Sequence, residues 1–246
     1  MCTVTILPEV VLSTSRSGHE RSLQLRVACN RDESIARAPA LPPLTRQFGE
    51  RLAVMPVDPD SGGTWIGANA AGIVCTLLNV YGGPRQTVGR RSRGTVIPSL
   101  LNCDCVNSAL ERVLKLPADD YSPFRLLVLD RQHLVECWNE DHAIHYRREA
   151  LHEPVMRTSS GLGDDLVIAP RVALFQQFLS AVTDTVAAQD LFHLHQWRGR
   201  EEVSVRMRRA DARTVSYTVV EIGDRVIRLV YRPAEAPDGI AVSVAA

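Results

Sequence analysis

Two stretches near the amino terminus decide the fold: Met1-Cys2-Thr3-Val4-Thr5-Ile6-Leu7 and Arg21-Ser22-Leu23-Gln24-Leu25-Arg26-Val27-Ala28, which continues into Cys29-Asn30-Arg31-Asp32-Glu33. Apolar and polar residues alternate in both, and this predicts strands over 2–7 and 21–28. Residues 13–20 are polar and contain a glycine, so a turn and a hairpin are expected. If the strands pair, the residues that follow the second strand lie close to the start of the first. Asn30, Arg31 and Asp32 are therefore expected to surround Cys2.

Cys2 becomes the terminal residue if the initiator Met1 is removed. It then carries a thiol and a free α-amine, whose reference pKa values are about 8.5 and about 8. Such a residue is a nucleophile with its own base, which is the arrangement that acyl transfer requires. Many chains begin with Met-Cys without consequence, so this prediction depends on the rest of the sequence.

Composition excludes several classes of protein. The chain has 246 residues, of which 45% are hydrophobic and 23% charged, and its 28 basic residues balance 28 acidic ones. No basic face for nucleic acid is expected. No apolar run reaches the ~20 residues that span a bilayer, and the start lacks a signal peptide, so the protein is expected to be cytoplasmic. The six cysteines and seven histidines show no metal-binding spacing, so neither a metal nor a cofactor is expected.

Five motifs occur in a fixed order: Asn30-Arg31-Asp32-Glu33, Ser61-Gly62-Gly63-Thr64-Trp65-Ile66-Gly67, Gly72-Ile73-Val74-Cys75-Thr76-Leu77-Leu78-Asn79, Ser92-Arg93-Gly94 and Thr214-Val215-Ser216-Tyr217-Thr218. Together with Met1-Cys2, this set resembles the NRDE family, whose eukaryotic members are called transport and Golgi organisation protein 2. The resemblance covers most of the chain and is densest in residues 1–100.

The layout of that family is similar to that of the cysteine N-terminal nucleophile (Ntn) hydrolases, such as bile salt hydrolases and penicillin acylases. The resemblance implies that Cys2 is the nucleophile, Asp32 an orienting carboxylate and Asn79 an oxyanion donor. Two positions depart from the hydrolases. Cys29 stands where they have an arginine three residues before the aspartate, and residues 156–160 offer serines where they have an asparagine after a threonine.

Asn30, Arg31 and Trp65 are the predicted binding residues. Gly62 and Gly63 permit a close approach of the backbone to a ligand, and Trp65 provides an aromatic wall. An alternative interpretation is structural: the glycines form a hairpin turn, Trp65 belongs to the core, and residues 30–33 form a solvated turn with ion pairs. The pair Gly82-Gly83 lacks the spacing of a phosphate-binding loop.

The remaining pattern predicts an α+β fold with two mostly antiparallel sheets covered by helices, in a single domain over residues 1–233. This fits the four-layer αββα sandwich that the resemblance to the Ntn hydrolases also implies. We expect helices over 94–116, 166–181 and 185–197, the last capped by Asp184 or Thr185. Further strands are expected over 124–129, 134–138, 143–146, 203–207, 214–222 and 225–231. Residues 234–246 are rich in proline and alanine and are expected to form a loose tail.

Two functions follow from these expectations. The first is a cysteine Ntn hydrolase or acyltransferase that acts on a non-peptide C–N amide bond of a small-molecule substrate. The second is a non-catalytic binding or trafficking protein for haem or a lipid-like ligand, with Cys2 as a thiolate ligand. The sequence has no CxxCH motif, so any haem would be bound without covalent attachment.

Overall fold

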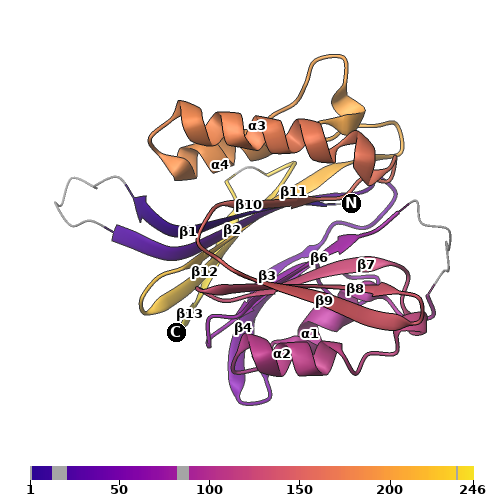
Figure 1. Cartoon of the computed structure of the whole chain (residues 1–246), viewed down its shortest axis with the longest axis vertical. Coiled ribbons are helices and arrows are strands. Elements are labelled where there is room, and N and C mark those ends of the chain that lie inside the picture. The colour runs from indigo at the N-terminus through magenta and orange to yellow at the C-terminus, as the bar shows by residue number, and fades with distance from the viewer. Residues whose placement is uncertain (1, 13–20, 82–88, 237) are drawn as a thin grey trace.

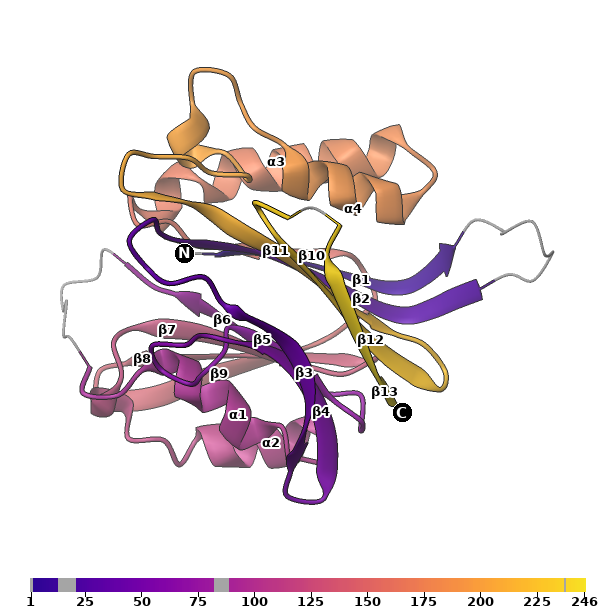
Figure 2. The ribbon, with the colours of Figure 1, turned by 180° about the vertical axis from the view of Figure 1, so that it is seen from behind.

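Two antiparallel sheets face each other in the computed structural model, and helices cover the outer side of each (Figures 1 and 2). The structure describes residues 2–12, 21–81, 89–236 and 238–246. Met1, the expected turn at 13–20 and the pair Gly82-Gly83 lie outside the described residues. No helix in the described ranges is long and apolar enough to cross a membrane.

The first sheet has the strand order β10-β1-β2-β11-β12-β13, and the second runs from β3 to β9 in sequence order. The strands of the first sheet are β1 (Cys2–Leu12), β2 (Arg21–Ser34), β10 (Val155–Thr158), β11 (Ala212–Ile222), β12 (Val226–Pro233) and β13 (Ile240–Ala245). Those of the second are β3 (Leu41–Phe48), β4 (Arg51–Val57), β5 (Ile66–Asn69), β6 (Val74–Asn79), β7 (Phe124–Leu129), β8 (His133–Glu140) and β9 (Ala143–Ala150).

Helices α3 (Ile168–Ala181) and α4 (Thr185–Leu194) cover the first sheet, and α1 (Val96–Leu100) and α2 (Val106–Val113) cover the second. Three apolar clusters fill the spaces between these four layers. The central cluster joins the two sheets through residues such as Val4, Val27 and Leu127. The outer clusters join each sheet to its own helices. The expected four-layer αββα sandwich is therefore confirmed.

The pairing of β1 with β2 positions several residues of the site. Cys2 lies opposite Arg31 in this register, and β2 continues to Ser34, beyond the predicted end at residue 28. Residues 30–33 are therefore part of a strand and do not form a solvated turn. Because side chains alternate along a strand, Cys29 and Arg31 face the second sheet with Cys2, whereas Asn30 and Asp32 face the helices.

Several elements differ from the prediction, and strands β3, β4 and β10 were not expected at all. The expected helix over 94–116 is two short helices, because the buried Asn69 amide donates to the carbonyl oxygens of Leu101 and Cys103 and holds the chain between them against the sheet. The expected strand over 203–207 is wrong: Glu201–Val203 is a 3-10 turn, and none of residues 203–207 belongs to a strand. The carbonyl oxygens of Val203 and Ser204 accept from the Arg171 guanidinium and are not part of a strand ladder.

The expected loose tail over 234–246 is wrong, because it contains strand β13. This strand pairs with β12 from Val226↔Ala245 to Tyr231↔Ile240. Val244 is 5% exposed and belongs to the central apolar cluster. Apolar and polar residues alternate weakly over 240–245, and the proline and alanine content of residues 234–246 favoured a tail over a strand.

Candidate active site

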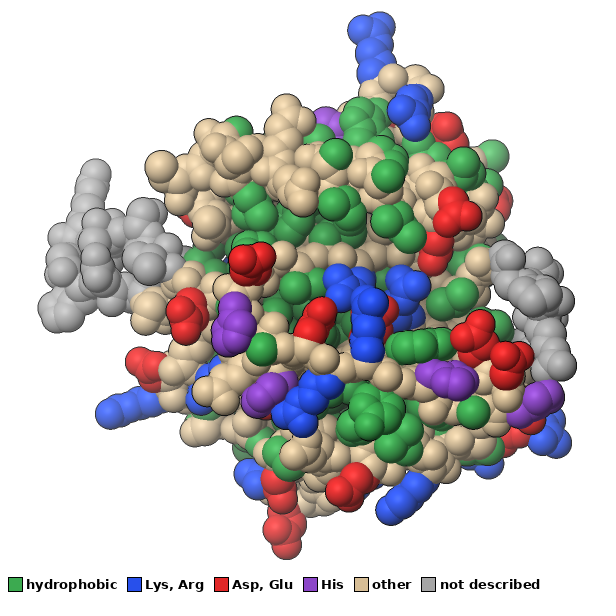
Figure 3. Space-filling model, in the orientation of Figure 1, with side chains coloured by type: hydrophobic (Ala, Val, Ile, Leu, Met, Phe, Trp, Pro, Cys, Tyr) green, Lys and Arg blue, Asp and Glu red, His purple; other side chains and the backbone are tan. Residues whose placement is uncertain are grey.

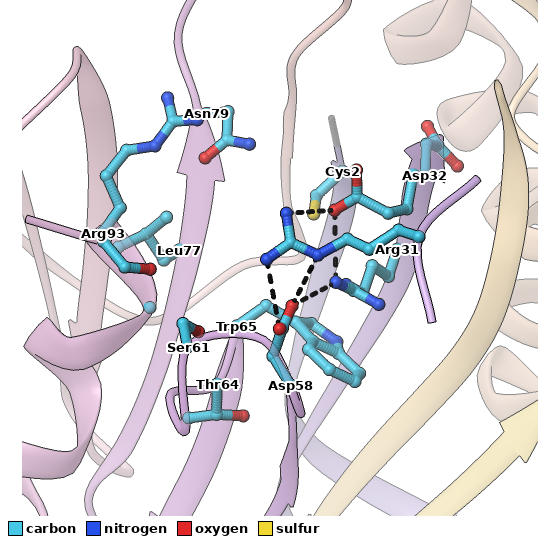
Figure 4. A pocket seen from close by; sticks show the side chains of 14 residues that line it. Cys2, Arg31, Asp32, Asp58, Ser61, Thr64, Trp65, Leu77, Asn79 and Arg93 are labelled. Atoms are coloured by element: carbon cyan, nitrogen blue, oxygen red, sulfur yellow. Dashed lines mark hydrogen bonds and ion pairs between the residues drawn. The ribbon is translucent and has the colours of Figure 1, made fainter. Parts of the chain in front are cut away.

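A small cavity of about 90 Å³ opens between the sheets at the start of β1, where Cys2 lies. It brings together five of the six residues predicted for the site: Cys2, Arg31, Asp32, Trp65 and Asn79 (Figure 4). The other lining residues are Glu33, Arg37, Asp58, Ser61, Thr64, Leu77, Ser92, Arg93 and Gly94.

Cys2 is 4% exposed and is fixed by the end of β10. Its backbone nitrogen donates to Ser159 Oγ at 3.3 Å, and its carbonyl oxygen accepts from the Ser159 amide at 2.9 Å. If Met1 is removed, this same nitrogen becomes the α-amine. The Ser159 hydroxyl therefore lies where it can orient the amine of a terminal cysteine.

The thiols of Cys2 and Cys29 lie on the same face of the β1–β2 pair. The pKa of the Cys2 thiol is lowered, first because Cys29 donates a hydrogen bond to it, although burial acts in the opposite direction. The pKa of Cys29 is raised well above its ordinary value by the same hydrogen bond and by burial. Of these two buried thiols, Cys2 is therefore the one that ionises more readily.

Asp32 lies on the opposite face of β2 from the Cys2 thiol, and in Figure 4 its carboxylate points away from the sulfur atom. It is 2% exposed and accepts a hydrogen bond from Thr214 Oγ1 at 2.6 Å. Burial raises the pKa of this carboxyl group, while the positive charge of Arg171 acts against the rise. The Asp32 charge also raises the pKa of the Cys2 thiol, so this carboxylate does not promote thiolate formation.

Arg31 is held rigidly in the wall of the cavity. Its Nη2 donates to Asp58 Oδ2 at 2.7 Å and to Glu33 Oε2 at 3.1 Å. Its guanidinium carbon lies 4.4 Å from the centre of the Trp65 ring, within cation–π distance. Arg37 Nε lies 3.0 Å from the same Asp58 carboxylate. Arg31 is therefore ion-paired and stacked on Trp65. This excludes the alternative of a solvated turn over residues 30–33.

Asn79 ends β6 and is partly exposed at the mouth of the cavity. Its Nδ2 donates to the Tyr81 hydroxyl at 3.2 Å. Nearby, Arg93 also lines the cavity and donates to the carbonyl oxygen of Pro123 at 2.8 Å. Burial lowers the pKa of the Arg93 guanidinium, and Cys2 is among the groups whose charge acts against that shift. An amide and a cation therefore flank the space in front of the thiol.

Asn30 does not line the cavity. Its side chain is 1% exposed and points toward helix α4, where Nδ2 donates to the carbonyl oxygens of His193 at 2.9 Å and Val205 at 3.0 Å. Both amide hydrogens are used, so its role is to join β2 to the helix layer. The strand alternation that separates Asn30 from Arg31 could not be assigned while the strand was expected to end at residue 28.

Sequence reasoning did not assign roles to Ser159, Arg171, Asp58 or Arg93. Arg171 is 1% exposed and donates to Thr3 Oγ1 at 2.9 Å and to Thr158 Oγ1 at 2.5 Å, which fixes β1 and β10 beside Cys2. A lone arginine in a helix gives no sign of this role. Arg93 did carry a signal, because it belongs to the motif Ser92-Arg93-Gly94.

Neither a metal nor haem fits the site. No group of three or more potential metal ligands occurs among the described residues. Cys2, the expected haem ligand, is buried against Cys29 in a cavity of about 90 Å³, well below the roughly 300–1,000 Å³ of typical ligand pockets. The thiol is therefore not presented to a group as large as haem.

Solved structures with the same fold have low sequence identity to this chain. Penicillin V acylase from Agrobacterium tumefaciens aligns with a TM-score of 0.52 and 11% identity, over 98% of this chain and 77% of that one. A Caenorhabditis elegans N-acylethanolamine-hydrolyzing acid amidase ortholog gives 0.56 and 11%, over 89% and 92%. A mutant of conjugated bile acid hydrolase from Clostridium perfringens gives 0.50 and 13%, over 98% and 92%.

These likenesses show the Ntn hydrolase fold. No curated protein matches the chain. The sequence profile described as Transport and Golgi organisation 2 (TANGO2) matches residues 10–208, and the chain therefore belongs to the transport and Golgi organisation 2 family.

Proposed function

We propose that this protein is a cysteine Ntn hydrolase or acyltransferase that acts on the non-peptide C–N amide bond of a small-molecule substrate. The observation that carries the proposal is the position of Cys2: its thiol faces the cavity, and its backbone nitrogen faces the Ser159 hydroxyl at 3.3 Å. One residue thereby presents both a sulfur nucleophile and, after removal of Met1, an amine base.

The proposed reaction begins with attack of the Cys2 sulfur on the amide carbonyl carbon. The thiol proton passes to the α-amine, and the tetrahedral oxyanion accepts a hydrogen bond from Asn79 Nδ2, which swings from Tyr81. The C–N bond then breaks, and the α-ammonium returns its proton to the leaving nitrogen. The resulting thioester on Cys2 is resolved by water or by another acyl acceptor.

Asp32 acts on the amine in this scheme. A negative charge beside an ammonium group raises the pKa of the amine and so strengthens it as a base. Arg171 and Thr214 hold the carboxylate on the helix side of β2, and Ser159 accepts from the nitrogen. In this scheme Asn30 has a structural role only.

The test is turnover of fluorogenic N-acyl aminocoumarins by purified protein whose intact mass shows the loss of Met1. Cys2→Ala and Cys2→Ser are expected to lower turnover by about three orders of magnitude or more. Cys105→Ser, which changes an exposed thiol, is the matched control and should leave turnover unchanged. An acyl adduct on the Cys2 peptide, seen by mass spectrometry, supports the thioester step.

Full turnover by Cys2→Ala would contradict the proposal, as would a mature chain that retains Met1. A non-catalytic carrier would instead bind the acyl compounds, release no coumarin and form no adduct.

A further inference from the structure

A second and much larger opening lies at the edge of the inter-sheet space, between β10 and the strands β7 and β8. Its volume is about 850 Å³, within the range of small-molecule pockets. Basic side chains gather at the middle of this face of the molecule, below the helix layer (Figure 3). We call this opening the arginine groove, after the three arginines that line it: Arg125, Arg147 and Arg157.

The inward-facing side chains of β7 and β8 change from apolar to charged at this groove. On β7, Leu127 and Leu129 point into the central apolar cluster, and Arg125 has the same orientation at the near end of the strand. On β8, Leu134 is in the cluster and Glu136 follows on the same face. Side chains of β7 and β8 that point between the sheets are therefore apolar in the middle of the sandwich and charged at its edge. The apolar core ends at these charged residues.

One buried carboxylate holds the three guanidinium groups together. Glu136 is 4% exposed, and its oxygens lie 2.9 Å from Arg125 Nε, 2.6 Å from Arg147 Nη2 and 2.9 Å from Arg157 Nε. Burial alone would raise the pKa of Glu136, but the arginines lower it overall, so this group remains ionised. One negative charge thus faces three positive ones.

Three carboxylates of the lining, Asp119, Glu140 and Asp141, lie at the β8–β9 turn end of the groove, where Asp119 pairs with His142 and Glu140 accepts from Trp138. Two other carboxylates contact the arginine cluster from its rim. Glu149 pairs with Arg157 at 2.7 Å on the outer side. Asp164 lies 3.9 Å from Arg125, beyond hydrogen-bond distance, and its Oδ1 accepts from the Ser160 amide. Positive charge is therefore concentrated around Glu136, at Arg125 and at Arg147, whose side chain is 56% exposed, and the acidic residues of the lining lie toward the β8–β9 turn.

The other walls of the groove are largely apolar. Tyr121 and Phe124 line one side, and Met156, Ile168 and Val172 line the other. Trp138 is partly exposed between them. A floor of guanidinium groups beneath apolar walls suits a ligand that has both an apolar body and an acidic group.

The groove adjoins the candidate nucleophile. In the β1–β10 register Val4 lies opposite Arg157, and Ser159 donates to the carbonyl of Cys2. Arg157 is therefore the diagonal neighbour of Cys2 on the same face, at a typical Cα separation of about 7–8 Å. Thr158, which lines the groove, also donates to the Cys2 carbonyl oxygen at 3.4 Å.

We propose that the arginine groove binds the anionic end of an elongated, mostly apolar substrate whose scissile amide reaches Cys2. Arg147 and Arg125 receive a carboxylate or phosphate group, and the apolar walls hold the body of the molecule. The placement of the amide rests on the proposed function, whereas recognition of the anion does not.

The test is a titration of the Cys2→Ala variant, which removes turnover, with dansyl-labelled undecanoic acid and with the neutral primary amide of the same probe. The acid is expected to bind saturably and about tenfold more tightly than the amide. Arg147→Gln should weaken binding of the acid by about tenfold and leave binding of the amide unchanged. Competition by dodecanoate against dodecyl phosphate identifies which acidic group the groove prefers.

Arg148→Gln is the matched control. Arg148 is the next residue of β9, and its side chain points to the other face of the sheet, where Nη1 donates to Asn107 Oδ1 at 2.8 Å. This variant should bind both probes as the parent does. Equal affinity for the acid and the amide, or equal behaviour of Arg147→Gln and Arg148→Gln, would overturn the proposal.

The two proposals fail separately. If the acid binds as described but the protein with Cys2 cleaves no amide, the groove proposal holds and the hydrolase proposal fails. If the protein cleaves neutral amides and Arg147→Gln changes neither cleavage nor binding, the hydrolase proposal holds and the groove proposal is overturned.

Discussion

At the scale of single residues, Cys29 has the largest influence on the pKa of the Cys2 thiol. A thiol that donates a hydrogen bond to the Cys2 sulfur stabilises the thiolate without adding a fixed positive charge. The fixed charge comes instead from Arg31, which is already paired with Asp58 and stacked on Trp65. In this arrangement Cys29 lowers the pKa of the candidate nucleophile, and Arg31 forms part of the cavity wall.

Gly63 supports the opposite wall by allowing two backbone segments to meet. A Cβ at Gly63 would lie 2.3 Å from the Gly94 carbonyl carbon, whereas a Cβ at Gly94 would meet nothing closer than 3.4 Å. Gly63→Ala must therefore push the segment at Gly94 away and strain the hydrogen bond from the Thr64 amide to the Gly94 carbonyl oxygen. We expect Gly63→Ala to lower the free energy of unfolding by about 2 kcal/mol.

Urea denaturation of Gly63→Ala and Gly94→Ala checks this prediction. The second variant changes the facing glycine of the same contact and should remain within about 0.5 kcal/mol of the wild type. If both variants lose the same stability, the close approach at Gly63 is not the cause.

At the scale of elements, β2 is the strand on which the sequence analysis was most informative. Alternation in residues 21–28 predicted the strand, and its pairing with β1 brought Arg31 opposite Cys2. The end of the strand was placed too early, because Asn30-Arg31-Asp32-Glu33 contains the polar residues that usually mark a turn. These side chains are satisfied by ion pairs and by backbone carbonyls of other segments, which a local pattern does not reveal.

Helix α4 begins at a cap that the sequence did predict. Asp184 accepts hydrogen bonds from the backbone nitrogens of Val186 and Ala187, each at 3.0 Å. Asp184→Ala removes the acceptor and is expected to lower the free energy of unfolding by about 1 kcal/mol. Asp184→Asn keeps an oxygen in the same place and should lose much less. Urea midpoints of the two variants test the cap, and equal losses would show that the acceptor oxygen is not the cause of the stabilisation.

At the scale of the whole molecule, four layers are joined by buried polar contacts as well as by apolar packing. His193 of α4 is 1% exposed, and its Nε2 lies 2.7 Å from Thr5 Oγ1 of β1. Burial, together with the charges of Arg26 and Arg171, lowers the pKa of His193 to about 3. The imidazole is therefore neutral in the folded protein.

This neutral histidine makes stability depend on pH. Above the unfolded pKa of about 6.5 both states are neutral, and the contribution of His193 is constant. As the pH falls below that value the unfolded chain takes up a proton that the folded protein excludes until about pH 3. The free energy of unfolding should therefore decrease by up to about 1.4 kcal/mol per pH unit in this window.

Urea unfolding at about pH 7 and about pH 5 measures that decrease, and His193→Gln serves as the comparison. The variant has no group that titrates at this position, so its loss of stability between the two pH values should be smaller. Carboxylates elsewhere affect both proteins alike. An identical loss in the two proteins would show that His193 is not the group responsible.

The sequence predicted the four layers of the sandwich better than it predicted the strands and charged side chains at the edges of the sheets. Strand and helix periods predicted sheets covered by helices, because each layer repeats an apolar pattern that only a facing layer can bury. The family resemblance implied the same four-layer sandwich. Strand β13 was missed, since its composition resembles that of a tail, although Val244 enters the core. The arginine groove was missed for the opposite reason: Arg125, Glu136 and Arg157 look like ordinary exposed charges until the pairing of distant strands places them together.

The opposite orientations of Arg31 and Asp32 on β2 limit how the amino-terminal hairpin can vary. The connection between its two strands can gain or lose residues without disturbing the pairing of Cys2 with Arg31. A single insertion or deletion inside either strand, by contrast, reverses every side chain beyond that point. In β1 such a change would direct the Cys2 sulfur at the helices, and in β2 it would direct the Asp32 carboxylate at the neighbouring sheet, so variation in length is tolerable only outside the paired segments.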